Sequence, residues 1–154
     1  NLGQYVANQV PEKEIILWDG FCITHERVEE TDVITAKSQH PEALVLMHPE
    51  CNPSIWKHAD FMGSTSQIIE YAANSEHPSF IIGTEAGILH SLKKRAPEKT
   101  YHLLSECLVC QNMKKTTLMD VEKALTGQVP EIQLDPTLMA LAERSLLRML
   151  NPNG

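Results

Sequence analysis

The sequence predicts an α/β fold, in which a parallel sheet carries helices on both faces. Short apolar segments alternate with amphipathic ones along roughly the first hundred residues, and helical crossovers of this kind join parallel strands. The apolar segments that are predicted to be strands are residues 14–18, 43–47, 59–62, 79–82 and 101–104. Each of them is followed directly by a cluster of polar residues. Because the carboxyl ends of parallel strands line the ligand crevice, these clusters predict an active site and therefore an enzyme.

The first helices are predicted from their capping residues. An amphipathic helix at residues 1–7 opens the chain with no strand before it, so we expect the chain to begin in the middle of a fold. Thr31 can cap a helix that ends before Pro41. Pro53 suits the first turn of the helix that follows the second strand.

The later helices are predicted in the same way. Ser64 or Thr65 caps one after the third strand. The helix after the fourth strand carries apolar residues at helical spacing and basic residues near its negative end, namely Ile88, Leu89, Leu92, Lys93, Lys94 and Arg95. Beyond Cys110 the alternation stops, and two helices are expected at 117–125 and 135–150. The last one has an apolar stripe that must cover something, formed by Leu138, Leu141, Ala142, Leu146 and Met149.

Composition limits the possible functions. With 154 residues and 42% hydrophobic content the chain can build one compact core. A net charge of -7, with no long run of Lys or Arg, argues against nucleic-acid binding. No apolar run approaches the roughly 20 residues of a membrane helix. The protein is therefore expected to be soluble. Four cysteines without the dense spacing of a secreted scaffold indicate the reducing cytoplasm, with paired disulfides as the alternative.

Two cysteine motifs follow predicted strands. Cys22 and His25 stand three apart and can reach one metal or one substrate, although a half-buried thiol beside a loop histidine is the simpler interpretation. Cys107 and Cys110 could be a redox couple, half of a zinc site or iron–sulfur ligands. A stand-alone zinc or redox module that uses all four of these residues is therefore an alternative.

Other strand ends carry groups suited to acid–base chemistry and anion binding. His48 and Glu50 flank a proline that fixes the bend, so both can face one substrate, whereas a surface turn with a buried Cys51 is the alternative. Ser64 and Thr65 offer hydroxyls and free N–H groups at a helix start, where anions bind and where plain capping is common. Glu85 is interpreted as a favourable first-turn charge. Four further histidines are expected to be solvated: His40, His58, His77 and His90.

Several long motifs then resemble one family. They are Asn1-Leu2-Gly3 through Tyr5-Val6-Ala7, Trp18-x-Gly20-Phe21-Cys22-x-x-His25-Glu26, His48-Pro49-Glu50-Cys51-Asn52-Pro53, Ala59-Asp60-Phe61-x-Gly63-Ser64-Thr65-Ser66, Ile82-Gly83-Thr84-Glu85 and Cys110-x-Asn112-Met113-Lys114-Lys115. In this order and over this length the chain resembles quinolinate synthase, from Asn1 to the last helix.

The resemblance implies a fold, a cofactor and a reaction. Members of the family have three similar α/β units around a cavity, and each unit gives one Cys to a 4Fe-4S cluster with one open iron position. They condense iminoaspartate with dihydroxyacetone phosphate to quinolinate for NAD biosynthesis, releasing phosphate and water. L-Aspartate oxidase or aspartate dehydrogenase would supply the iminoaspartate.

The family's residue roles carry over onto this sequence. Cys22 and Cys110 match two cluster ligands, and the third would lie upstream, so the chain resembles the second half of an enzyme. Cys51 and Cys107 match positions that are not ligands. The matching site residues are Glu50 for proton transfer, His48 for hydrogen bonding to substrate, His25 beside the cluster and the substrate, and Ser64 and Thr65 for a carboxylate or phosphate.

The resemblance also divides the chain. Residues 1–22 would end a preceding unit, residues 23–110 would form a complete α/β unit, and residues 111–154 would pack on a missing N-terminal unit. The chain alone is therefore expected to hold no stable cluster and to be inactive.

Overall fold

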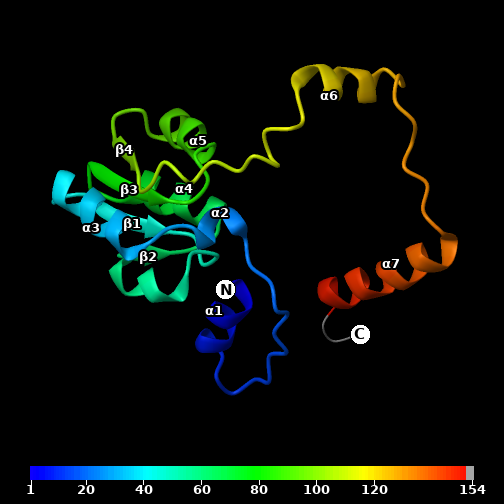
Figure 1. Ribbon diagram of the computed structural model, residues 1–154, viewed down its shortest axis with the longest axis horizontal. Coiled ribbons are helices and arrows are strands. Elements are labelled where there is room, and N and C mark those ends of the chain that lie inside the picture. Colours follow the sequence, from blue (N-terminus) through cyan, green and yellow to red (C-terminus); the bar gives the residue numbers. More distant parts are fainter. Residues whose placement is uncertain (152–154) are drawn as a thin grey trace. The chain divides into compact units, whose positions relative to one another are not determined.

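The computed structural model describes residues 1–151 (Figure 1). The chain divides into two compact units, Asn1–Gln111 and Asn112–Gly154. The first unit contains a four-stranded sheet, and the second contains two helices. No helix in the described part of the chain has both the length and the apolar character needed to cross a bilayer.

The sheet of the first unit is entirely parallel. Its strands are β1 (Leu44–Met47), β2 (Phe61–Met62), β3 (Ser79–Gly83) and β4 (Thr100–Leu103), in the order β2-β1-β3-β4. All pairs run parallel, and the register sets Leu46 of β1 beside Ile82 of β3. The predicted parallel sheet is therefore confirmed, and β1 and β3 form its centre.

Helices cover both faces of this sheet. Side chains alternate along the central strands, so that Val45, Met47 and Ile81 enter one core cluster and Leu46, Phe80 and Ile82 enter the other. On the first side the core is completed by α3 (Glu30–Gln39) and the 3₁₀ helix η1 (Pro53–His58). On the second side it is completed by α4 (Thr65–Asn74) and α5 (Ile88–Arg95). This arrangement confirms the predicted α/β/α layering.

Most helix starts are those that the capping residues predict. Ser64 caps α4 and exchanges hydrogen bonds with Gln67 in a capping box. Asn52 accepts a hydrogen bond from Ser54 N at the start of η1, with Pro53 in its first turn.

The predicted cap at Thr31 is wrong. Helix α3 begins at Glu30 with Glu29 as its N-cap, because the backbone N–H of Glu29 donates to the Asp32 carboxylate at 2.9 Å and fixes the start two residues earlier. Thr31 lies inside the helix, where its carbonyl accepts the Thr35 hydroxyl.

The predicted strand at 14–18 is also wrong. After α1 (Leu2–Gln9), residues 14–18 are extended but unpaired, and Ile16 and Trp18 are 92% and 91% exposed. A strand requires a neighbour for its backbone N–H and C=O groups. Within residues 1–151 the sheet contains only β1 to β4, so this segment has no neighbour to pair with.

The second unit consists of α6 (Leu118–Leu125) and α7 (Pro136–Leu150), close to the predicted helices. Thr117 and Asp120 form a capping box at the start of α6, and Asp135 caps α7. Gly127, which follows α6, has a φ of 70° that suits glycine. Neither helix has a buried residue, so the apolar stripe of α7 is uncovered.

Lys99 stabilises the end of α4. Its Nζ donates to Ala72 O and Ser75 O, both at 2.5 Å, and lies 5.5 Å from the centroid of the Phe80 ring. Carbonyls at a helix end attract a cation. We expect Lys99→Met to lower the free energy of unfolding by about 1–3 kcal/mol in a urea titration of the 154-residue chain. Lys13→Met, at an exposed turn, is the control, and an equal loss in both variants would contradict the role of Lys99.

Candidate functional site

The end of β3 is the point where most of the predicted site residues meet. Gly83 O accepts hydrogen bonds from His48 N at 3.0 Å and from Cys51 Sγ at 3.3 Å. A Cβ at Gly83 would lie only 2.9 Å from Met47 Cγ, so a side chain here would displace the Met47 side chain on β1. The turn after β1, which carries His48 and Glu50, is therefore packed directly against the end of β3.

Cys22 is linked to the end of β3 through the side chain of His25. Cys22 is the N-cap residue of α2 (Ile23–Glu26), and its Sγ lies 3.1 Å from His25 Nδ1. The other ring nitrogen, His25 Nε2, lies 3.0 Å from Thr84 Oγ1, directly after β3. Both ring nitrogens are occupied, which fixes the plane of the imidazole beside the thiol.

Cys110 is hydrogen-bonded to Glu85, which follows Thr84 in the loop after β3. Glu85 accepts a hydrogen bond from Cys110 N through Oε1 at 3.3 Å and one from Gly87 N through Oε2 at 2.7 Å. Ala86 N adds a bond to Leu108 O at 2.8 Å. Cys22 and Cys110 are thus anchored to two successive residues, and both lie at the carboxyl edge of the sheet.

A cavity of about 930 Å³ opens beside Cys22 and Glu50. The remaining lining comes from the start of α1 and from residues 16–21. Asn1 borders it and donates to Glu50 O at 3.0 Å. The cavity is large enough for a small organic acid.

Glu26 connects the start of α1 to the turn after β1. Its carboxylate accepts Asn1 Nδ2 at 2.5 Å and Asn52 Nδ2 at 2.9 Å, which ties α1 to the turn after β1. The sequence interpretation assigned no role to these three residues, although all three lie within the motifs it quoted. Their function depends on contacts across 25 and 26 positions, which no local pattern indicates.

The two imidazoles of the site are neutral near pH 7. Burial, and to a smaller extent His48, lower the pKa of His25 to about 4, against an opposing effect of Glu85. Burial also lowers the pKa of His48, and Glu50 opposes this shift. The rings lie 5.0 Å apart between centroids. Each therefore acts as a hydrogen-bonding group rather than as a cation.

Comparison with known proteins identifies the family. The family model described as "NadA: Quinolinate synthetase A protein" matches residues 1–151. The chain belongs to the quinolinate synthase family. The quinolinate synthases of Caldicellulosiruptor saccharolyticus and Alkaliphilus metalliredigens are 53% and 54% identical to it over 150 residues, which is 97% of this chain and 50% of each relative. That of Clostridium perfringens is 42% identical over all 154 residues, or 51% of the relative.

The resemblance drawn from the motifs is thereby confirmed. The chain spans about half the length of the curated quinolinate synthases that it matches.

The structure does not assemble the alternative zinc site. Among residues 1–151, no three side chains of the His, Cys, Asp or Glu type form a group that could hold a metal ion. Cys107 Sγ instead lies 3.1 Å from Ser105 Oγ. The cluster that the family resemblance implies would take two thiolates from this chain, and thiolates are the ligands that iron–sulfur clusters prefer. Cys22 and Cys110 are reduced, partly exposed and located at one edge, so the donors present fit two positions of such a cluster.

Ser64 and Thr65 lie apart from this cavity. Both are exposed at the start of α4, after β2, and the Ser64 hydroxyl accepts from Gln67 N at 3.4 Å. Neither lines the cavity beside Cys22 and Glu50. The capping role is present, and the Ser64 N–H is itself bonded to Gln67 Oε1 at 2.8 Å.

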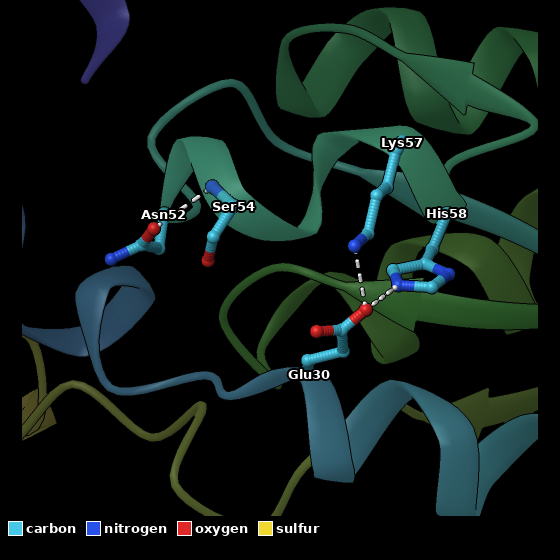
Figure 2. A network of polar contacts seen from close by, with 5 residues as sticks. All are labelled: Glu30, Asn52, Ser54, Lys57 and His58. Atoms are coloured by element: carbon cyan, nitrogen blue, oxygen red, sulfur yellow. Dashed lines mark hydrogen bonds and ion pairs between the residues drawn. The ribbon is translucent and has the colours of Figure 1, made fainter.

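Three of the four histidines that were expected to be solvated have partners. His58 Nε2 pairs with Glu30 Oε1 at 2.7 Å, and Lys57 reaches the same oxygen at 2.8 Å (Figure 2). Hydrogen bonds from Lys57 and His58 lower the pKa of Glu30. His40 stacks on His102 with centroids 3.4 Å apart, and His77 packs edge-on against Phe80. His90 is exposed as expected.

Glu85 was also misinterpreted. Helix α5 begins at Ile88 with Gly87 as its N-cap, so Glu85 precedes the first turn. Its carboxyl group bridges two loops instead of facing only the helix end. The polar residues after β3 were the only sequence signal for this contact, and no role was predicted for Thr84 among them.

Cys51 is expected to resist alkylation in the folded chain. It is fully buried, and burial raises the pKa of its thiol to about 12, so the reactive thiolate is scarce. With iodoacetamide at about pH 8, Cys22, Cys107 and Cys110 should be modified first, as mass spectrometry would record. The pKa of the Cys51 thiol is higher in the folded chain than in the unfolded chain. Its burial therefore contributes fully to the free energy of unfolding below about pH 9, and this contribution is lost as the pH rises toward 12. In urea all four should react, and early modification of Cys51 without urea would contradict its burial.

Proposed function

We propose that this chain forms one half of a quinolinate synthase active site. The reaction would condense iminoaspartate with dihydroxyacetone phosphate, release phosphate and water, and give quinolinate for NAD biosynthesis. One observation carries the proposal: the loop Gly83–Glu85 is hydrogen-bonded to the segments that bear Cys22, Glu50 and Cys110, in a chain of the quinolinate synthase family.

Cys22 and Cys110 would be two of the three ligands of a 4Fe-4S cluster, and the third would come from outside this chain. Neither cysteine is in a disulfide, and each belongs to a loop at the carboxyl edge of the sheet. When bound, the cluster would supply a Lewis-acidic iron that polarises a substrate oxygen or nitrogen. Cys51, whose burial keeps it protonated, would remain outside the ligand set.

Glu50 would be the catalytic residue for proton transfer. Isomerisation and loss of water both require a proton to move, and a carboxylate that borders the cavity beside Cys22 is suited to that task. The neutral His48 would donate or accept a hydrogen bond to the substrate, and its Nδ1 already accepts from Glu50 N at 3.2 Å. His25 would bind at the boundary between cluster and substrate, since it contacts Cys22.

Ser64 and Thr65 would hold a substrate carboxylate or the phosphate. Ser64 and Thr65 place two hydroxyls at the start of α4, and the positive end of the helix dipole favours an anion there. Because these residues lie at the end of β2, beside β1, they would contact a different part of the substrate from Glu50.

The rest of the protein would complete the architecture. Residues 1–22 would end a preceding α/β unit, residues 23–110 would form one whole unit, and residues 111–154 would pack on the N-terminal unit. Two features support this division. Ile16 and Trp18 are almost fully exposed in an extended segment, and α7 has an uncovered apolar stripe.

Two further expectations accompany this function. L-Aspartate oxidase or aspartate dehydrogenase would be the upstream partner, because an imine of aspartate must come from oxidation of the amine. The enzyme would be cytoplasmic, where thiol ligands stay reduced.

A fusion protein tests the proposal. The portion of the C. saccharolyticus relative that this chain does not match would be placed before Asn1, and the fusion is called the reconstituted enzyme below. Purified without oxygen, it should be brown, contain iron and sulfide, and form quinolinate. The 154-residue chain alone should hold no stable cluster and form no quinolinate. Turnover by the chain alone would contradict its incompleteness, and a fusion with bound cluster but no quinolinate would contradict the function.

A further inference from the structure

The loop after β3 contacts three of the segments that carry predicted site residues, namely those of His25, His48 and Cys110. Gly83 O receives His48 N, Thr84 Oγ1 pairs with His25 Nε2, and Glu85 Oε1 receives Cys110 N. Thr84 and Glu85 are themselves assigned neither to proton transfer, nor to substrate binding, nor to the cluster.

Both side chains are buried polar groups with specific partners. Thr84 is 3% exposed and Glu85 is 8% exposed. Burying a hydroxyl or carboxyl group is costly unless it is hydrogen-bonded, so an apolar side chain would fill this space more favourably. The polar residues are explained by their partners, which lie 59 and 25 positions away in the sequence.

We infer that Thr84 and Glu85 are positioning residues that hold Cys22 and Cys110 at one edge of the sheet before any cluster binds. The purpose of this arrangement rests on the proposed function, whereas its geometry does not. Thr84 acts through the His25 imidazole, whose other nitrogen contacts the Cys22 thiol. Glu85 acts directly on the backbone of Cys110. A two-thiol site that is already assembled loses less conformational freedom when the cluster binds.

The geometry of Glu85 requires a carboxyl group. One oxygen accepts from Gly87 N at 2.7 Å and the other from Cys110 N at 3.3 Å. A glutamine has a single carbonyl oxygen, and its NH₂ group would face the second N–H donor. Since the bond to Gly87 is local and shorter, Glu85→Gln should keep it and release Cys110.

A cross-linking experiment on the 154-residue chain tests the role of Thr84. Cys107→Ser is used as background, because Cys107 is close enough to Cys110 in sequence to compete for the reagent. A short bifunctional thiol reagent is added to the folded chain, and mass spectrometry of the digest quantifies the Cys22–Cys110 product. Thr84→Val should slow its formation by up to about tenfold, the equivalent of one lost hydrogen bond.

Two variants separate positioning from general stability. Thr84→Ser keeps the hydroxyl and should restore the rate of cross-linking. Thr35→Val is the matched control, since its hydroxyl donates to Thr31 O on the exposed side of α3. It should leave the rate unchanged.

Hydrogen exchange tests Glu85 independently. In Glu85→Gln the amide of Cys110 should exchange up to about tenfold faster, because it loses its acceptor. Glu70→Gln, at an exposed position of α4, is the matched control. This measurement decides the inference if Thr84→Val does not fold.

The outcomes that would overturn the inference are distinct from those that would overturn the function. Equal cross-linking in the background chain and in Thr84→Val, or absence of the Cys22–Cys110 product in both, would overturn it. Unchanged exchange at Cys110 in Glu85→Gln would do the same. None of these readouts needs iron or substrate, so a reconstituted enzyme that makes no quinolinate would refute the proposed function while the positioning result stands.

Discussion

Replacing Cys110 by serine in the reconstituted enzyme should remove most of its bound iron and lower quinolinate formation by about a thousandfold or more. A serine hydroxyl is a poor substitute for a thiolate at an iron–sulfur cluster, and loss of a Lewis acid costs several kcal/mol of transition-state stabilisation. Iron and sulfide analysis and the absorption spectrum measure the cluster, and the initial rate of quinolinate formation measures activity. Both should fall together.

Cys107→Ser is the matched control for this prediction. The substitution is the same and lies in the same loop, but Cys107 Sγ lies 3.1 Å from the Ser105 hydroxyl, whereas Cys110 is held by Glu85. Iron and activity should stay within about a factor of three of the unsubstituted enzyme. If Cys107→Ser lost iron as completely as Cys110→Ser, the two cysteines would act as a pair, and the assignment of one ligand to this loop would be wrong.

Glu50→Gln is expected to lower kcat of the reconstituted enzyme by about a hundredfold to ten-thousandfold, the range associated with loss of a general acid or base. The substitution preserves the volume of the side chain. It also preserves the backbone bonds of residue 50 to His48 Nδ1 and to Asn1, so the turn after β1 should keep its shape. The cluster content should therefore be unchanged.

Measuring both iron content and kcat distinguishes a catalytic role of Glu50 from a structural one. Glu42→Gln, an exposed residue before β1, is the control and should leave both quantities unchanged. A Glu50→Gln enzyme that loses its iron would indicate a structural role for Glu50. One that keeps its full kcat would show that another group moves the proton.

The elements of the fold could be predicted because their signals are local. The apolar runs that became the central strands β1 and β3 are nearly continuous, as expected for strands buried on both faces. Ser64, Thr117 and Asp135 cap their helices through bonds to residues three positions later. The segment 14–18 carries the same signal, yet it remains unpaired. Strand formation depends on a neighbour that the segment's own residues do not encode.

The roles of single side chains were less predictable for a similar reason. His58 was expected to be solvated, but its partner Glu30 lies 28 positions earlier on α3. Glu85 was expected to interact with its own helix, but it also holds Cys110 through a loop contact. A pattern of residue types identifies groups that can hydrogen-bond without identifying the groups that they will meet.

The amino-acid sequence was enough to assign the α/β fold, to locate its reactive clusters at strand ends and to recognise the quinolinate synthase family. These conclusions depend on periodicity, capping and motif order, which are properties of neighbouring residues. Tertiary structure alone decided which clusters meet, that Thr84 and Glu85 join them, and that burial holds His25 neutral and Cys51 protonated. Distance and desolvation act through space, so they exist only once the chain has folded.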